Sequence, residues 1–142
     1  FGPVSVVGTY FLHVHTLSFD PWLPAIGMGF FTVAVLNVNN MRDIKNDEEA
    51  GKITIPVRIG IKKAKLYHAC LTFGGILSFV LYSVLYANSW TEYLYLIVMP
   101  GFIKILVDIF KTEEDYKLDP FLKYTSMTTF TLSLAFGASI IL

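Results

Sequence analysis

Two carboxylates and an amide recur at four-residue intervals where an apolar stretch of the chain gives way to a charged one. Asn39, Asp43 and Asp47 follow directly on the apolar run 30–38. If one helix continues through all three, they lie on the same face, because residues four apart are neighbours on a helix surface. Mg²⁺ prefers oxygen ligands and is typically held by one or two carboxylates together with substrate phosphates. The spacing therefore predicts a magnesium site suited to a phosphorylated substrate.

Basic residues follow the last of these acids closely. They are Lys52, Arg58, Lys62 and Lys63. Cationic side chains bind phosphate oxygens directly, so acids followed by bases match what a diphosphate–Mg²⁺ complex requires. Gly51 and Gly60 indicate tight turns within this segment.

The competing interpretation is a solvated loop of mixed charge that binds nothing. Carboxylates four residues apart are common on ordinary helices, so their spacing alone does not decide between the two. Asn39 and Asn40 favour a site, because polar side chains at the end of an apolar membrane helix are costly and usually functional. A calcium-binding EF-hand loop is excluded, since Lys45 stands where that pattern needs an Asp or Asn.

The composition is that of a membrane protein. Of the 142 residues, 54% are hydrophobic and 15% are charged, against about 45–50% and about 25% in soluble domains. A spanning helix needs about 20 mostly apolar residues, and five stretches approach or reach that length. They are residues 1–15, 22–38, 66–87, 93–110 and 121–142. We therefore predict an all-α, multi-spanning bundle of about five transmembrane helices.

The fourth stretch carries two unusual features. Pro100 lies in its middle, and we expect a kink there because proline cannot donate a backbone hydrogen bond. Lys104 and Asp108 stand four residues apart, and we expect them to form an internal ion pair facing the interior of the bundle. A part in substrate binding is the less favoured alternative for this pair.

Charge distribution predicts the orientation of the bundle. Every Lys and Arg outside the fourth stretch lies in the second-to-third or the fourth-to-fifth connection or next to it. With five helices these two connections share one side, which the positive-inside rule places in the cytoplasm. The net charge of zero gives no reason to expect nucleic-acid binding, and the single cysteine excludes an internal disulfide or a cysteine metal cluster.

The segment 39–60 resembles the second aspartate-rich motif of the UbiA superfamily of membrane prenyltransferases. Its form, with Asn39–Asn40 before Arg42–Asp43 and a Gly51–Lys52 pair further on, is most similar to the branch that prenylates 1,4-dihydroxy-2-naphthoate in menaquinone biosynthesis. Residues 2–10 and 119–123 also resemble that branch, so the similarity covers most of the chain.

The resemblance implies a fold and a reaction. Family members have about nine transmembrane helices and two aspartate-rich motifs that face each other across a central cavity. Mg²⁺ holds a polyprenyl diphosphate, diphosphate departs, and an aromatic ring attacks the allylic carbocation. In the naphthoate branch the carboxyl group is lost as well, which gives demethylmenaquinone. The implied location is the bacterial inner membrane, with the motif loop in the cytoplasm and lipid around the helices.

The resemblance also assigns roles to residues. Asn39, Asp43 and Asp47 match the positions that bind the metal and the diphosphate, and both carboxylates count among the catalytic residues. Lys52 and Arg58 match basic positions that contact the diphosphate of the prenyl donor. Such groups stabilise the charge that develops on the departing diphosphate.

Two further residues complete the catalytic set that the resemblance implies. Arg42 either binds phosphate or pairs with a neighbouring acid, and Tyr10 lies near the prenyl chain or the carbocation, which an aromatic face stabilises. The chain has no first aspartate-rich motif, and it begins at Phe1 without a basic or small-residue signal region. We therefore expect residues 1–142 to be the C-terminal part of one prenyltransferase domain, inactive without the N-terminal half.

Two alternatives remain open. The first is a UbiA-type enzyme that acts on another aromatic acceptor, such as 4-hydroxybenzoate, although the form of residues 39–43 argues against that branch. An ion-coupled transporter fragment with Asp43 and Asp47 as its ion site is the alternative from another class. It is disfavoured because transporter sites lie near the bilayer midplane, whereas these acids lie at the cytoplasmic edge.

Overall fold

All regular structure in residues 1–141, the part of the chain that the computed structural model describes, is helical. The elements are α1 (Gly2–Val14), α2 (Trp22–Arg42), α3 (Ile44–Glu49), α4 (Ile55–Ile59), α5 (Ile61–Tyr86), η1 (Trp90–Val98), α6 (Met99–Lys111), η2 (Asp115–Leu118) and α7 (Asp119–Ile141). The predicted all-α fold is confirmed. The expected end of the last helix at Leu142 lies outside the described residues.

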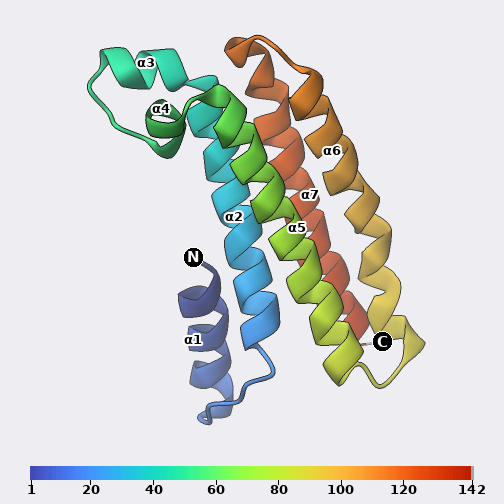
Figure 1. Cartoon of the computed structure of the whole chain (residues 1–142). Helices are drawn as coiled ribbons and strands as arrows, with labels where there is room; N and C mark the ends of the chain where they lie inside the picture. Colours follow the sequence, from blue (N-terminus) through green and yellow to red (C-terminus); the bar gives the residue numbers. More distant parts are fainter. Residues whose placement is uncertain (142) are drawn as a thin grey trace.

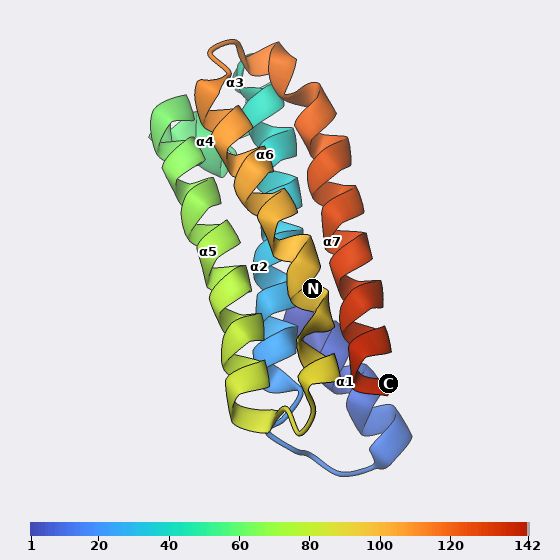
Figure 2. The same ribbon diagram turned by 90° about the vertical axis from the view of Figure 1, so that its right-hand side faces the viewer.

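The long helices α2, α5, α6 and α7 run side by side as a bundle, and α1 packs against the first half of α2 (Figures 1 and 2). The short helices α3 and α4 project from one end of the bundle. The connection between α6 and α7 lies at that same end, whereas the α1–α2 and α5–η1 connections lie at the opposite end. The two Lys- and Arg-rich connections therefore share one end, as the charge distribution predicted.

Three helical segments are long and apolar enough to cross a membrane: Trp22–Arg42, Ile61–Tyr86 and Trp90–Lys111. The multi-spanning character of the chain is thereby confirmed. The other two predicted spans are also helical, but α1 has only 13 residues and covers roughly 20 Å. Helix α7 has 23 residues but is rich in Thr and Ser, whose hydroxyls donate to carbonyls of their own helix, as Thr125 and Thr129 do.

An aromatic cluster joins the long helices of the bundle. Phe31 of α2 stacks on Phe102 of α6 with ring centroids 4.2 Å apart, and Phe79 of α5 meets Phe136 of α7 edge-on at 4.9 Å. The hydroxyl of Tyr95 in η1 donates to the carbonyl oxygen of Phe79 over 2.8 Å. The four long helices α2, α5, α6 and α7 all contribute to this cluster, which therefore links them to one another.

At Pro100, where a kink is predicted, the structure has a change of helix type. The 3₁₀ segment η1 ends at Val98 and α6 begins at Met99, with Pro100 in its first turn. The N–H of Met99 donates to the carbonyl of Leu96, three residues back rather than four. Proline at the start of a helix sacrifices no hydrogen bond, because the first N–H groups have no intrahelical partner.

The expected ion pair between Lys104 and Asp108 is wrong. No Lys104–Asp108 contact within 4.0 Å is found in the described residues, where Lys104 is exposed and Asp108 half-buried. A base that precedes an acid by four residues is the less favourable order on a helix. Both side chains instead line a cavity of about 350 Å³ between α6 and α7.

The close approach of α2 and α5 depends on glycine at position 75. A Cβ atom there would lie 2.7 Å from the ring of Phe31, which is fully buried and stacked on Phe102 and so has no room to move. We expect Gly75→Ala to lower the free energy of unfolding by about 1–3 kcal/mol, the range for overpacked cores, as measured by thermal unfolding in detergent. Gly137→Ala is the matched control, because nothing lies within 4 Å of its Cβ position. Equal effects of the two substitutions would contradict this account.

Candidate functional site

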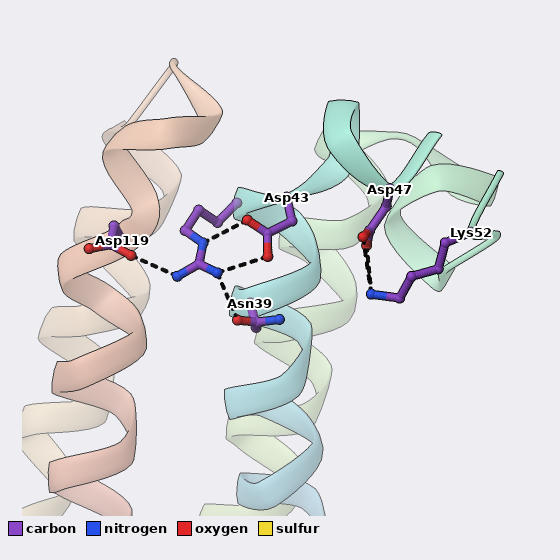
Figure 3. A network of polar contacts seen from close by, with 6 residues as sticks. Asn39, Asp43, Asp47, Lys52 and Asp119 are labelled. Carbon is purple, nitrogen blue, oxygen red and sulfur yellow. Dashed lines mark hydrogen bonds and ion pairs between the residues drawn. The ribbon is translucent and has the colours of Figure 1, made fainter. Parts of the chain in front are cut away.

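The single helical face predicted for the motif is interrupted at its centre. Helix α2 ends at Arg42, and Asp43 (φ −94°, ψ 10°) caps it before α3 begins at Ile44. The N–H of Asp43 still donates to the carbonyl of Asn39 (3.1 Å), and that of Asp47 to the carbonyl of Asp43 (2.8 Å). The three residues therefore stay on successive turns, but α3 leaves the axis of α2 (Figure 1). As a result, Asp43 and Asp47 point toward different partners (Figure 3).

Arg42 joins most of the polar residues at this end of α2. Its Nε and Nη2 donate to the two carboxylate oxygens of Asp43, each over 2.8 Å, and Nη2 also donates to Oδ1 of Asn39 over 3.1 Å. Its Nη1 donates to Oδ1 of Asp119 on α7 over 2.7 Å (Figure 3). Of the two roles left open for Arg42, pairing with an acid is the one present in this structure.

The partnership with Arg42 also sets the charge of Asp43. The hydrogen bonds from the guanidinium stabilise the carboxylate form and hold the pKa of Asp43 below its ordinary value of 3.8. Asp43 is therefore ionised at neutral pH. Its side chain is 26% exposed, so the carboxylate is both negative and within reach of a cation from solution.

Asp47 forms a second, separate ion pair. Its Oδ1 and Oδ2 lie 3.0 and 3.2 Å from Nζ of Lys52, and the backbone N–H of Lys52 donates to the Asp47 carbonyl over 2.8 Å. Gly51, with φ +70°, makes the turn that brings Lys52 back. The Asp47 side chain is 11% exposed and that of Lys52 is 58% exposed. The pair therefore has a nearly buried carboxylate and an ammonium group that faces solvent.

Arg58 and Tyr10 lie apart from these pairs. Arg58 is exposed on α4, which packs near the start of α5. Tyr10 is half-buried on α1, which starts against Gly29 and runs away from the motif (Figure 1). It lies roughly 25 Å from Asn39 along the helix axes, so the structure does not bring Tyr10 to the Asn39–Asp43 cluster.

The donor set suits Mg²⁺ only if the ligand itself completes it. Within residues 1–141, no three His, Cys, Asp or Glu side chains are arranged to hold a metal ion. Mg²⁺ does not need three, because substrate phosphates and water supply its remaining ligands. Asn39, Asp43 and Asp47 offer the hard oxygen atoms that this requires, and each carboxylate has a basic side chain within hydrogen-bonding distance.

An apolar cavity opens beside Asn39. It has a volume of about 340 Å³ and lies between the start of α1, the second half of α2 and the start of α7. Its lining is hydrocarbon apart from two residues, and comprises Phe1, Thr32, Val33, Val35, Leu36, Asn39 and Leu122. The polar cluster and the apolar cavity therefore meet at Asn39, an arrangement that fits a ligand with an anionic head and a hydrocarbon tail.

Asp119 is the site residue to which sequence analysis gave no role. It lies 77 positions from Arg42, beyond the reach of any spacing argument. The only signal was its place at the start of the 119–123 stretch, which resembles the same family branch as the motif.

Comparison with known proteins gives a consistent result along the chain. The profile of the UbiA prenyltransferase family matches residues 1–134. The 1,4-dihydroxy-2-naphthoate octaprenyltransferases of Haemophilus influenzae and Escherichia coli are 37% and 35% identical over all 142 residues, which is 46% of the length of each. The human UbiA prenyltransferase domain-containing protein 1 is 34% identical over 85 residues, 60% of this chain and 24% of that protein. The chain thus spans about half the length of these two bacterial octaprenyltransferases. No solved structure is a significant match.

Proposed function

The chain belongs to the UbiA prenyltransferase family, and from that premise we propose that it forms the C-terminal part of an enzyme that transfers a polyprenyl group from its diphosphate to 1,4-dihydroxy-2-naphthoate. Two bacterial proteins named for octaprenyl transfer to this acceptor match the chain along its whole length, which supports the acceptor. Residues 1–142 then supply one wall of the site. A first aspartate-rich motif from an upstream segment supplies the other, so this chain alone is inactive.

The junction at Asn39 is the observation that carries the proposal. The ion pair of Arg42 and Asp43, with Asn39 bonded to it, stands at the charged end of α2, and the apolar cavity begins beside the same asparagine. A polyprenyl diphosphate has this polarity, with the reacting carbon where its two parts meet. Binding there places the bond to be broken at the edge of the membrane-spanning segment.

The residues of the site have two roles in the proposed reaction. Asn39, Asp43 and Asp47 would hold Mg²⁺, and Lys52 and Arg58 would bind oxygens of the diphosphate. Mg²⁺ supplies charge neutralisation for the leaving group when it is bound. The bond from the allylic carbon to oxygen breaks, and diphosphate leaves with the electron pair. The naphthoate ring then forms a carbon–carbon bond to the allylic carbon and loses its carboxylate as CO₂, which leaves the bonding electron pair in the ring and gives the reduced, hydroquinone form of demethylmenaquinone.

The proposed role of Tyr10 follows from its position. Because it lies roughly 25 Å along the helix axes from Asn39, it contacts the far part of the prenyl chain rather than the carbocation.

The proposed location is the inner membrane of a bacterial cell, with the motif end in the cytoplasm. Three candidate spans support membrane integration. The Lys- and Arg-rich connections gather at the end that holds α3 and α4, and the positive-inside rule favours the cytoplasm for that end.

The acceptor and the metal are tested together in membranes that contain the full-length protein. With labelled polyprenyl diphosphate, we expect a prenylated product from dihydroxynaphthoate and none from 4-hydroxybenzoate. Chelation of divalent cations by EDTA should abolish product formation, and added Mg²⁺ should restore it, because the diphosphate is bound through the metal. Product from 4-hydroxybenzoate alone would refute the proposed acceptor. Ion-driven flux without product would instead favour the transporter alternative.

A further inference from the structure

The guanidinium of Arg42 forms hydrogen bonds with residues at the ends of two helices, α2 and α7. On one side it bonds with Asp43 and Asn39 at the end of α2, and on the other with Asp119, the first residue of α7. The contact to Asp119 is its shortest, at 2.7 Å. Asp119 lies outside the sequence motif of residues 39–60.

A planar guanidinium has its donors in a fixed fork, so contacts on opposite edges fix the whole plane. Asp43 is adjacent to Arg42 in the chain and occupies Nε and Nη2. If Asp43 were its only partner, the Arg42 and Asp43 side chains could still rotate together about their side-chain torsions. The bond from Nη1 to Asp119 adds a point that does not belong to α2, and so it sets where Nη2 meets the amide oxygen of Asn39.

The backbone that carries Asp119 is itself held in place. Its neighbour Leu118 is 1% exposed and belongs to a buried cluster with Val38 and Met41, on α2 just before Arg42. Helix α7 is thus anchored to α2 one residue before Asp119. The carboxylate also stands in the first turn of α7, where a negative charge is favourable. The Asp119 side chain is 67% exposed, which makes it a poor candidate for a mainly stabilising contact.

We propose that Asp119 is a positioning residue of the diphosphate site, which acts through Arg42 to hold Asn39 and Asp43 in the arrangement that binds the metal–diphosphate group. This inference rests on the proposed function. It makes α7, and not only the motif on α2, a determinant of affinity for the head of the prenyl donor.

The test measures binding rather than turnover. In the full-length protein, Mn²⁺ replaces Mg²⁺, inorganic diphosphate is the probe, and the fraction of Mn²⁺ bound is followed by electron paramagnetic resonance. We expect Asp119→Asn to weaken binding about fivefold, the upper range for an exposed ion pair, with an unchanged unfolding temperature. Asp119→Glu should restore binding to within about twofold, since it keeps a carboxylate within reach of Nη1.

Glu114→Gln is the matched control. It removes a carboxylate from the same connection, but the ion pair of Glu114 is with Lys117 of that connection, at 2.9 Å, so binding should not change. The inference is overturned if Asp119→Asn binds as the wild type does, if Asp119→Glu fails to restore binding, or if Glu114→Gln weakens binding equally. A parallel Asp43→Asn variant distinguishes a failure of the role of Asp119 from a failure of the proposed diphosphate site. Weaker binding by Asp43→Asn alone refutes only the role of Asp119, whereas wild-type binding by both refutes the proposed site.

Discussion

Asp43→Asn should reduce prenyl transfer by at least about a hundredfold at neutral pH, because a metal ligand contributes several kcal/mol and each 1.36 kcal/mol is tenfold in rate. Asparagine keeps the size of the side chain and one oxygen for Arg42, but it loses the negative charge. Arg42 holds the pKa of Asp43 below 3.8, so the wild-type carboxylate is ionised at the neutral pH of the assay. Asp47→Asn should have a comparable effect, and it also leaves Lys52 without its carboxylate partner.

The control for both substitutions lies on α3, which begins directly after Asp43 and contains Asp47. Glu48 of α3 follows Asp47 directly and is exposed, so Glu48→Gln removes an equal charge from the same segment. Turnover of labelled polyprenyl diphosphate by the full-length protein in membranes is the measurement. Near-normal turnover by Asp43→Asn or Asp47→Asn would show that the metal role of that residue is wrong. A loss of activity in Glu48→Gln of the same size would point to general surface charge instead.

Arg42→Gln should weaken binding of the prenyl donor about thirtyfold, the sum of two ion pairs worth up to about 1 kcal/mol each. The substitution breaks the contacts to Asp43 and Asp119 together. It therefore frees both the carboxylate and the asparagine amide that the guanidinium orients. The KM for the donor should rise more than kcat falls, since the missing group acts on binding in both the ground state and the transition state.

Arg42→Lys distinguishes a positioning role from direct contact with phosphate. Lysine is a competent phosphate ligand as a point charge, so it should rescue most of the affinity if Arg42 touches the diphosphate. It lacks the planar fork, so it should stay close to Arg42→Gln if the arginine holds Asp43, Asn39 and Asp119 together. Combined with Asp119→Asn, the effect of Arg42→Lys should be less than additive, because the two residues share one contact. Full rescue by lysine, or strict additivity, would contradict the positioning role.

Much of the architecture could be read from local sequence. Runs of apolar residues predicted the helices, because only a helix satisfies its own backbone within lipid. The placement of Lys and Arg predicted which connections share an end, and the structure gathers both charged connections there. The motif resemblance pointed to the prenyltransferase family, and the family profile covers residues 1–134. Each of these inferences depends on residues that are close together in the sequence or on the overall amino-acid composition.

The relation between distant residues could not be obtained in that way. Spacing by four predicts a shared face only while one helix continues, and the break at Asp43 turns Asp47 toward Lys52. The Arg42–Asp119 contact depends on how α7 is positioned along α2. Leu118, just before α7, is buried in one cluster with Val38 and Met41 of α2. Charge patterns and hydrophobic runs thus predict which helices form and where their polar ends lie. Side-chain packing between helices decides which polar groups come into contact. A contact between residues 77 positions apart depends on all the buried side chains that position one helix against the other.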